Sequence, residues 1–184
     1  AKYSTDYPCS FMFVASMNPC PCGYYGDPTH RCVCTPGQIQ RYMNKISGPL
    51  LDRIDIQCEI SPVPFQDISK AAPGEPSAKI RERVIKAREV QAERFKDYKG
   101  IHCNAQMTER MIHQFAEPDE QGIELLRMAM EKLSLSARAY NRILKVARTI
   151  ADLAGSEQIK PDHIAEAVGY RTLDRGDWAE RGHL

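Results

Sequence analysis

The sequence lacks a phosphate-binding loop, a membrane span and a secretory leader. No glycine-rich loop of the GxxxxGK[ST] type occurs anywhere in its 184 residues. No apolar run approaches the roughly 20 residues that a bilayer-spanning helix requires. No leader combines basic, apolar and small residues at the start, so secretion is not indicated. We therefore expect a cytoplasmic protein that makes no membrane contact.

The chain also has almost no net charge, because 25 basic and 24 acidic residues leave +1. That balance gives no overall electrostatic case for nucleic-acid binding, which is typically carried by a strongly basic face. Seven cysteines are present. Their odd number and the absence of a leader favour a reducing compartment over a disulfide scaffold. In such a compartment clustered cysteines are typically metal ligands.

The first third of the chain predicts two β-strands and one short helix. Phe11–Ser16 is apolar throughout, as in a strand that is buried on both faces of a parallel sheet. In Ile54–Ile60 apolar and polar residues alternate, which indicates a strand with one buried face. A short helix over Gln38–Ile46 fits between them. These features predict the remnant of an α/β unit over residues 1–61.

The rest of the chain predicts an all-α bundle after a linker. Four prolines interrupt residues 62–77, so we place a domain boundary there and expect little regular structure. Beyond it, apolar residues recur at helical spacing, with Ser136 and Thr108 as N-caps and Gly155 as a C-terminal stop. The predicted helices are Ala78–Tyr98, Thr108–Phe115, Glu120–Leu133, Ser136–Leu153 and one that begins near Pro161. They form a helical domain over residues 78–175, followed by a flexible tail, 176–184.

Four cysteines in two closely spaced pairs predict a metal site within residues 20–34. Cys20 and Cys22 flank one proline, and Cys32 and Cys34 flank one valine. Four thiolates from two tight turns can surround one zinc ion, and a site with four protein ligands is structural rather than catalytic. The one-residue spacers are tighter than the usual two to four residues. His30 could replace one cysteine, and metal-free thiols or disulfides are the alternatives.

Three polar side chains are candidates for contact with a phosphate. Asn18 follows the first predicted strand, and ligands of open α/β sheets bind beyond the carboxyl ends of strands. The alternative is a turn residue before a proline. Arg53 could stabilise charge on a transferring phosphoryl group, or it could pair with a neighbouring aspartate. Arg138 lies in the first turn of a predicted helix, where an anion would be favoured and a cation is not.

Taken together, the motifs MNP (Met17–Pro19), LLDR (Leu50–Arg53) and LSARAYNRILKVARTIADL (Leu135–Leu153) resemble those of the magnesium-chelatase-related AAA+ ATPases. The longer segments NPCPCGY, SGPLLDRID and SARAYNRIL resemble the ComM/YifB branch. About 30 residues that carry the cysteines separate MNP from LLDR. This insertion favours that branch over the chelatase subunit itself. The resemblance extends from Phe11 to about Asp174.

The resemblance implies a fold and a set of roles. Residues 1–61 would be the C-terminal part of an AAA+ core, an αβα sandwich, and residues 78–175 its helical lid. Asn18 would be sensor 1, Arg53 an arginine finger acting in trans, and Arg138 the sensor-2 arginine. The whole protein would use ATP and Mg²⁺ in a hexameric ring of identical subunits that remodels DNA, as in branch migration during natural transformation. The fragment itself would be inactive.

Two other functions remain open from the sequence. The first is a chelatase-like ATPase that inserts a metal into a tetrapyrrole partner, and the cysteine insertion argues against it. The second is a non-enzymatic zinc module that binds nucleic acid or a protein partner, which needs no phosphate loop. We also expect the fragment to self-associate, because a strand at Phe11–Ser16 without its neighbours would present unpaired edges.

Overall fold

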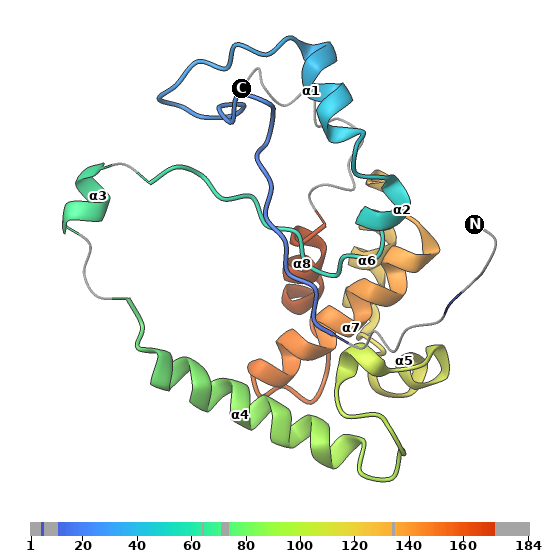
Figure 1. The fold of residues 1–184 in the computed structure, drawn as a ribbon. Coiled ribbons are helices and arrows are strands. Elements are labelled where there is room, and N and C mark those ends of the chain that lie inside the picture. The colour runs from blue at the N-terminus through green and yellow to red at the C-terminus, as the bar shows by residue number, and fades with distance from the viewer. Residues whose placement is uncertain (1–4, 6–10, 64, 71–73, 134, 172–184) are drawn as a thin grey trace.

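The structure, a computed structural model, describes residues 5, 11–63, 65–70, 74–133 and 135–171, and these are mainly helical (Figure 1). The elements in chain order are α1 (Pro36–Met43), α2 (Gly48–Leu51), α3 (Phe65–Lys70), α4 (Ser77–Arg94), the 3₁₀ helix η1 (Asn104–Gln106), α5 (Glu109–Phe115), α6 (Glu120–Lys132), α7 (Ala137–Leu153) and α8 (Pro161–Gly169). None of the described helices is both long and apolar enough to cross a membrane. The predicted tail 176–184 lies outside the described residues.

Helices α4 to α8 form a bundle, which we call the helical lid, with α7 at its centre. α7 packs against α4, α5, α8 and η1, and α8 also packs against α6. The buried side chains that join these helices are mostly aliphatic. The largest aliphatic side chains that are almost fully buried are Ile112, Leu126, Ile143, Ile159 and Ile164, and the ring of Phe95 is buried with them. Burying an aliphatic side chain of this size contributes about 1.5–3 kcal/mol, so this core supplies the main driving force for the bundle.

The helix ends follow the capping pattern that the sequence predicts. The Ser136 hydroxyl accepts a hydrogen bond from the Ala139 N–H group, and Thr108 caps α5 in the same way. Asp119, which we did not single out, caps α6. Gly155 ends the α7 segment with a φ of +66°, a left-handed conformation that side chains with a Cβ rarely adopt. These caps set the boundaries of α5 to α7 within one residue of the predicted ones.

Neither predicted strand forms, so the αβα remnant is not seen in the described residues. Residues 11–18 are exposed and extended without a ladder, and Met12 is 87 % exposed. Of the second predicted strand, one isolated parallel bridge between Gln57 and Arg171 is present in the described residues. The alternating pattern predicted that Ile56 and Ile60 would be buried and Gln57 exposed. The structure shows the opposite, because Gln57 is buried while Ile56 and Ile60 are exposed. A strand is stable only beside other strands, and the described residues offer it none.

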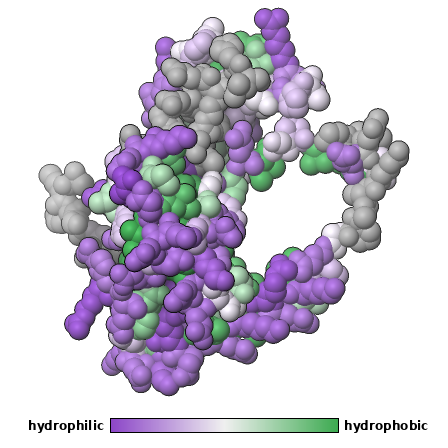
Figure 2. All heavy atoms as spheres, turned by 180° about the vertical axis from the view of Figure 1, so that it is seen from behind, coloured by the Kyte–Doolittle hydropathy of each residue, from purple (hydrophilic) through white to green (hydrophobic). Residues whose placement is uncertain are grey.

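Two features of the described helices were not predicted from the sequence. The linker contains a short helix, α3, after Pro64, because its prolines leave residues 65–70 uninterrupted. Of the apolar residues Ile80, Val84, Ala87 and Val90 in α4, only Ala87 is buried. The N-terminal part of α4 reaches away from the bundle (Figure 1), and its surface is mainly hydrophilic in the reverse view (Figure 2).

Candidate functional site

The four predicted metal ligands lie together at the end of the molecule that carries α1. The Sγ atoms of Cys20, Cys22, Cys32 and Cys34 all lie within 4.8 Å of one another. The Cys20–Cys22, Cys22–Cys32 and Cys20–Cys32 separations are 3.3, 3.5 and 3.7 Å. A tetrahedral zinc ion with Zn–S bonds of about 2.3 Å requires sulfur atoms about 3.8 Å apart. The cluster therefore fits zinc, and all four ligands would come from the protein.

Two glycine turns and an aspartate shape the loop between the cysteine pairs. Gly23 and Gly26 have φ values of +85° and +81°, so both need the conformational freedom of glycine. The Asp27 carboxylate accepts hydrogen bonds from the N–H groups of Thr29 and His30. The His30 ring stacks on Tyr24 and its Nδ1 lies 3.3 Å from Asp27. His30 therefore braces the loop instead of joining the four cysteines.

The thiol groups differ in how easily they lose a proton. A hydrogen bond from the backbone of Tyr24 lowers the pKa of Cys22 to about 6. Loss of solvent raises the pKa of Cys32 to about 12 and raises that of Cys34 as well. Because its pKa is the lower, Cys22 loses its proton before Cys32 and Cys34 do. A bound cation would supply the charge that stabilises the remaining thiolates.

Asn18 lies at the entrance to this loop. Its side chain is exposed. The Asn18 amide lies 3.9 Å from where a Cβ on Gly23 would be, an ordinary van der Waals distance, so the amide lies beside this glycine turn. A neutral amide therefore lies next to the cysteine loop, directly before Pro19 and Cys20.

Arg53 follows α2 in a compact turn, residues 48–54, that we call the finger turn. The N–H groups of Arg53 and Ile54 donate to the carbonyl oxygens of Leu50 and Leu51, which closes the turn. The Arg53 guanidinium group donates to the Pro49 carbonyl at 2.9 Å, and the residue is exposed. The alternative in which Arg53 pairs with Asp52 or Asp55 does not occur in the described residues.

The two aspartates that flank Arg53 instead contact the lid. Asp55 forms an ion pair with Arg142 of α7. Asp52 accepts a hydrogen bond of 3.4 Å from the hydroxyl of Ser136, the N-cap of α7, and its carboxylate lies 3.9 Å from Arg171. Sequence analysis missed these partners, because residues about 85 to 120 positions apart give no local signal.

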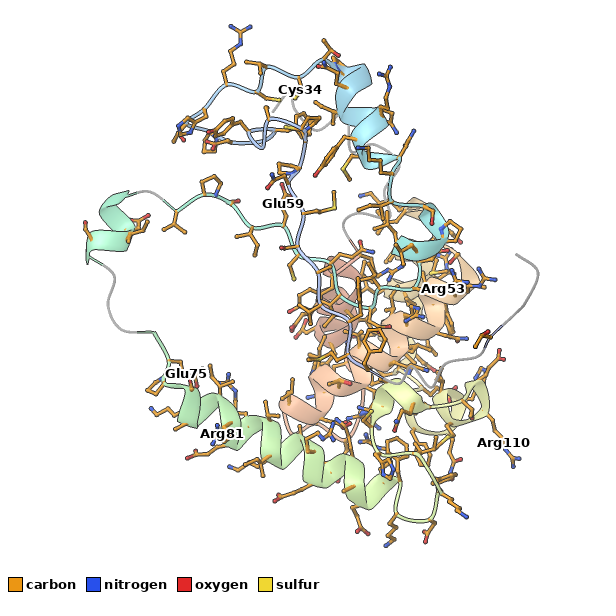
Figure 3. The ribbon with its side chains drawn as sticks, in the orientation of Figure 1. Cys34, Arg53, Glu59, Glu75, Arg81 and Arg110 are labelled. Carbon is orange, nitrogen blue, oxygen red and sulfur yellow. The ribbon has the colours of Figure 1, made fainter. Side chains whose placement is uncertain are left out.

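Arg138 lies two residues after Ser136, in the first turn of α7, and is exposed. Among the hydrogen bonds and ion pairs of the described residues, none joins two of the three side chains Asn18, Arg53 and Arg138. The finger turn and the start of α7 are nevertheless in direct contact through Asp52 and Ser136. Figure 3 shows Arg53 beside the lid and Cys34 at the far end of the chain's N-terminal part.

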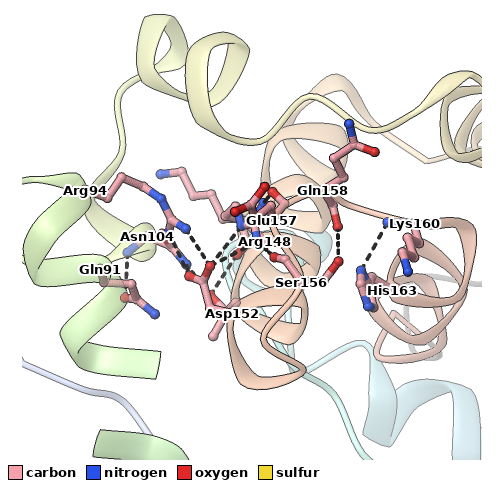
Figure 4. Close-up of polar contacts among 12 residues, drawn as sticks. Gln91, Arg94, Asn104, Arg148, Asp152, Ser156, Glu157, Gln158, Lys160 and His163 are labelled. Atoms are coloured by element: carbon pink, nitrogen blue, oxygen red, sulfur yellow. Dashed lines mark hydrogen bonds and ion pairs between the residues drawn. The ribbon is translucent and has the colours of Figure 1, made fainter. Parts of the chain in front are cut away.

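A buried polar network behind this surface was also not predicted (Figure 4). Asp152 of α7 accepts hydrogen bonds from Arg94 of α4, at 2.5 and 2.7 Å, and from Arg148, at 3.1 Å. Asn104 of η1 donates to the same carboxylate at 2.8 Å. Arg148 also donates to the backbone carbonyl groups that follow α7. The network fixes α4 and η1 against α7.

Two matches to known families cover almost all of the chain. Residues 74–171 match the family described as "Magnesium chelatase, subunit ChlI C-terminal", and residues 1–68 match "Magnesium chelatase, subunit ChlI". The first match alone spans more than half of the 184 residues. The chain therefore belongs to the magnesium-chelatase-related family of AAA+ ATPase-like proteins, as the motifs indicated.

Within that family the chain is similar to ComM and YifB proteins. It is 42 % identical over 176 residues to "Competence protein ComM" of Haemophilus influenzae, and the alignment covers 95 % of this chain. It is 44 % identical over 170 residues, 92 % of this chain, to "Uncharacterized protein YifB" of Escherichia coli. A Mycobacterium tuberculosis relative is 36 % identical over 165 residues. The chain spans about a third of the length of these relatives.

Proposed function

We propose that this chain is the sensor, finger and lid portion of an ATPase ring that remodels DNA. The observation that carries the proposal is the environment of Arg53. Both neighbouring aspartates are engaged by the lid, whereas the Arg53 side chain is exposed and, in the described residues, hydrogen-bonds only to the Pro49 carbonyl of its own turn. An arginine held in this way suits a finger that reaches the ATP of a neighbouring subunit.

The proposed roles follow from what each side chain can donate. Arg53 would stabilise negative charge on the transferring phosphoryl group, an effect of about 10³–10⁵ in rate for known fingers. Asn18 would orient the attacking water as sensor 1, and Arg138 would contact phosphate from the lid as sensor 2. ATP and Mg²⁺ would be held by the whole protein, in a hexameric ring of identical subunits. DNA as the client is supported by the similarity to a competence protein.

Zinc would be structural in this scheme. The four cysteines fit a tetrahedral ion and would leave no open coordination position for a reacting water. Bound zinc would supply a positive charge that keeps four thiolates together. The chain's own residues, the two glycine turns and the Asp27 cap, shape the loop around it. The site would thereby fix the segment that follows Asn18.

A second function is favoured by the family description itself, which names the chelatase subunit. In that case the ATPase would drive metal insertion into a tetrapyrrole held by a partner protein. The two functions share the ATPase chemistry and differ in the client. Stimulation by DNA therefore separates them.

The test is ATP hydrolysis by the full-length protein, with and without single-stranded and branched DNA. We expect DNA to stimulate hydrolysis, and Arg53→Ala to lower kcat by about 10³ or more while ATP still binds. Arg110→Ala is the matched control, because Arg110 of α5 is also exposed and points away from the bundle (Figure 3). Normal turnover by Arg53→Ala would exclude the finger role. A rate of ATP hydrolysis that DNA does not change would favour the chelatase-like function.

A further inference from the structure

The finger turn is held to the lid of its own subunit by contacts on both sides of Arg53. We propose that these contacts form a latch that orients Arg53, and that Asp55 and Arg142 are its positioning residues. This inference rests on the proposed function, because it assigns the pair a role in presenting the finger. Neither residue would touch ATP.

The outer side of the latch is the ion pair between Asp55 and Arg142. Asp55 is two residues after Arg53, and Arg142 lies on the second turn of α7. Both side chains are partly exposed, so the pair can open and close without unfolding the bundle. A single pair of this kind is weak in isolation. Its effect here depends on the other contacts that restrain the same turn.

The inner side of the latch is Arg171, which follows α8 and is almost fully buried. Its guanidinium group donates to the carbonyl oxygen of Ile54, the residue after Arg53. It also lies 3.9 Å from Asp52. Next to it, the Gln57 N–H donates to the Tyr170 carbonyl at 2.9 Å, which adds a backbone hydrogen bond between the segment after the finger turn and the chain after α8.

Arg53 is left out of the latch although both of its neighbours belong to it. Its neighbours Asp52 and Ile54 are bound to the lid segment, while its guanidinium group hydrogen-bonds only to the Pro49 carbonyl in the described residues. Within the lid, α7 begins after its N-cap Ser136, and its first turn carries Arg138, the proposed contact to the subunit's own nucleotide. Any rotation of α7 about that contact would move the finger turn with it. The latch would thus link one ATP site to the next in the ring.

Asp55→Asn in the full-length protein tests the latch, because it removes the charge and keeps the shape. We expect kcat for ATP to fall about tenfold with an unchanged KM, since misplacing a catalytic group by about 1 Å can cost up to 10²-fold. We also expect faster amide hydrogen exchange at Arg53, Ile54 and Gln57, which reports the latch without ATP. Exchanging the charges, Asp55→Arg with Arg142→Asp, should restore both readouts toward wild type. Glu131→Ala, which breaks an exposed pair with Arg127 on α6, is the control.

The outcomes separate the latch from the proposed function. If the wild-type protein does not hydrolyse ATP, the proposed function fails, while hydrogen exchange still tests the latch. If Arg53→Ala is inactive but Asp55→Asn hydrolyses ATP like wild type, the positioning role is excluded. Unchanged exchange in Asp55→Asn would also exclude it. So would a charge exchange that leaves kcat as low as in Asp55→Asn.

Discussion

Replacing Asp152 by alanine should destabilise the lid more than any other loss of one acidic side chain, because two buried cations share this carboxylate. The Asp152 side chain is fully buried, and those of Arg94 and Arg148 are 13 % and 4 % exposed. Water cannot replace the lost acceptor at that depth. Removing one partner of a buried ion pair costs about 3–5 kcal/mol. A 60–100-residue domain loses about 4–8 °C in Tm per kcal/mol, so we expect a fall of at least about 12 °C.

The assay is thermal unfolding of the chain followed by circular dichroism of its helices, with Glu131→Ala as the control. Arg127–Glu131 and Arg148–Asp152 are both ion pairs at a spacing of four residues, but the first is more than half exposed. An exposed pair contributes about 0.2–1 kcal/mol, so the control should lose only a few degrees. Equal shifts for Asp152→Ala and Glu131→Ala would refute the conclusion that the buried network holds α4 against α7.

Two further predictions concern packing and the metal. Gly122→Ala should lower the free energy of unfolding by about 1–3 kcal/mol, because the added Cβ would lie 2.9 Å from the Pro118 Cβ. Gly169→Ala is the control and should not destabilise the fold, because a Cβ at Gly169 would meet no atom within 4 Å. Denaturant titration measures both variants. Purified wild-type protein should contain one zinc ion per chain by metal analysis, and Cys32→Ser should lose it. Cys58→Ser, which lies outside the cluster, should retain the zinc. Equal zinc content in both variants would exclude the four-cysteine site.

The lid could be predicted from the sequence because its signals are local. Ser136 and Thr108 mark helix starts. Leu126 in α6 and Ile143 in α7 each belong to a series of apolar residues at helical spacing, so the bounds of α5, α6 and α7 were predicted within one residue. The cysteine cluster was predictable for the same reason, since its two pairs lie only nine residues apart. Each of these features is determined by neighbours within about one dozen residues.

The features that sequence analysis missed depend on distant partners. Phe11–Ser16 is apolar enough for a buried strand, but strand formation requires neighbouring strands, and the described residues provide none. Asp55 was judged as a possible partner of Arg53 because it is near in sequence, whereas its actual partner is Arg142. The alternating pattern predicted that Gln57 would be exposed, but its contact with the chain after α8 buries it.

Complementation between two inactive variants of the full-length protein tests the central claim most directly. In the proposed ring, Asn18 acts on its own subunit's ATP and Arg53 acts on the ATP of the next subunit. Rings that mix Asn18→Ala with Arg53→Ala subunits would contain sites with both groups intact. The account predicts that co-expressing the two variants restores ATP hydrolysis, although each alone is inactive. Mixed rings that stay inactive would contradict the assignment of Arg53 as a finger in trans.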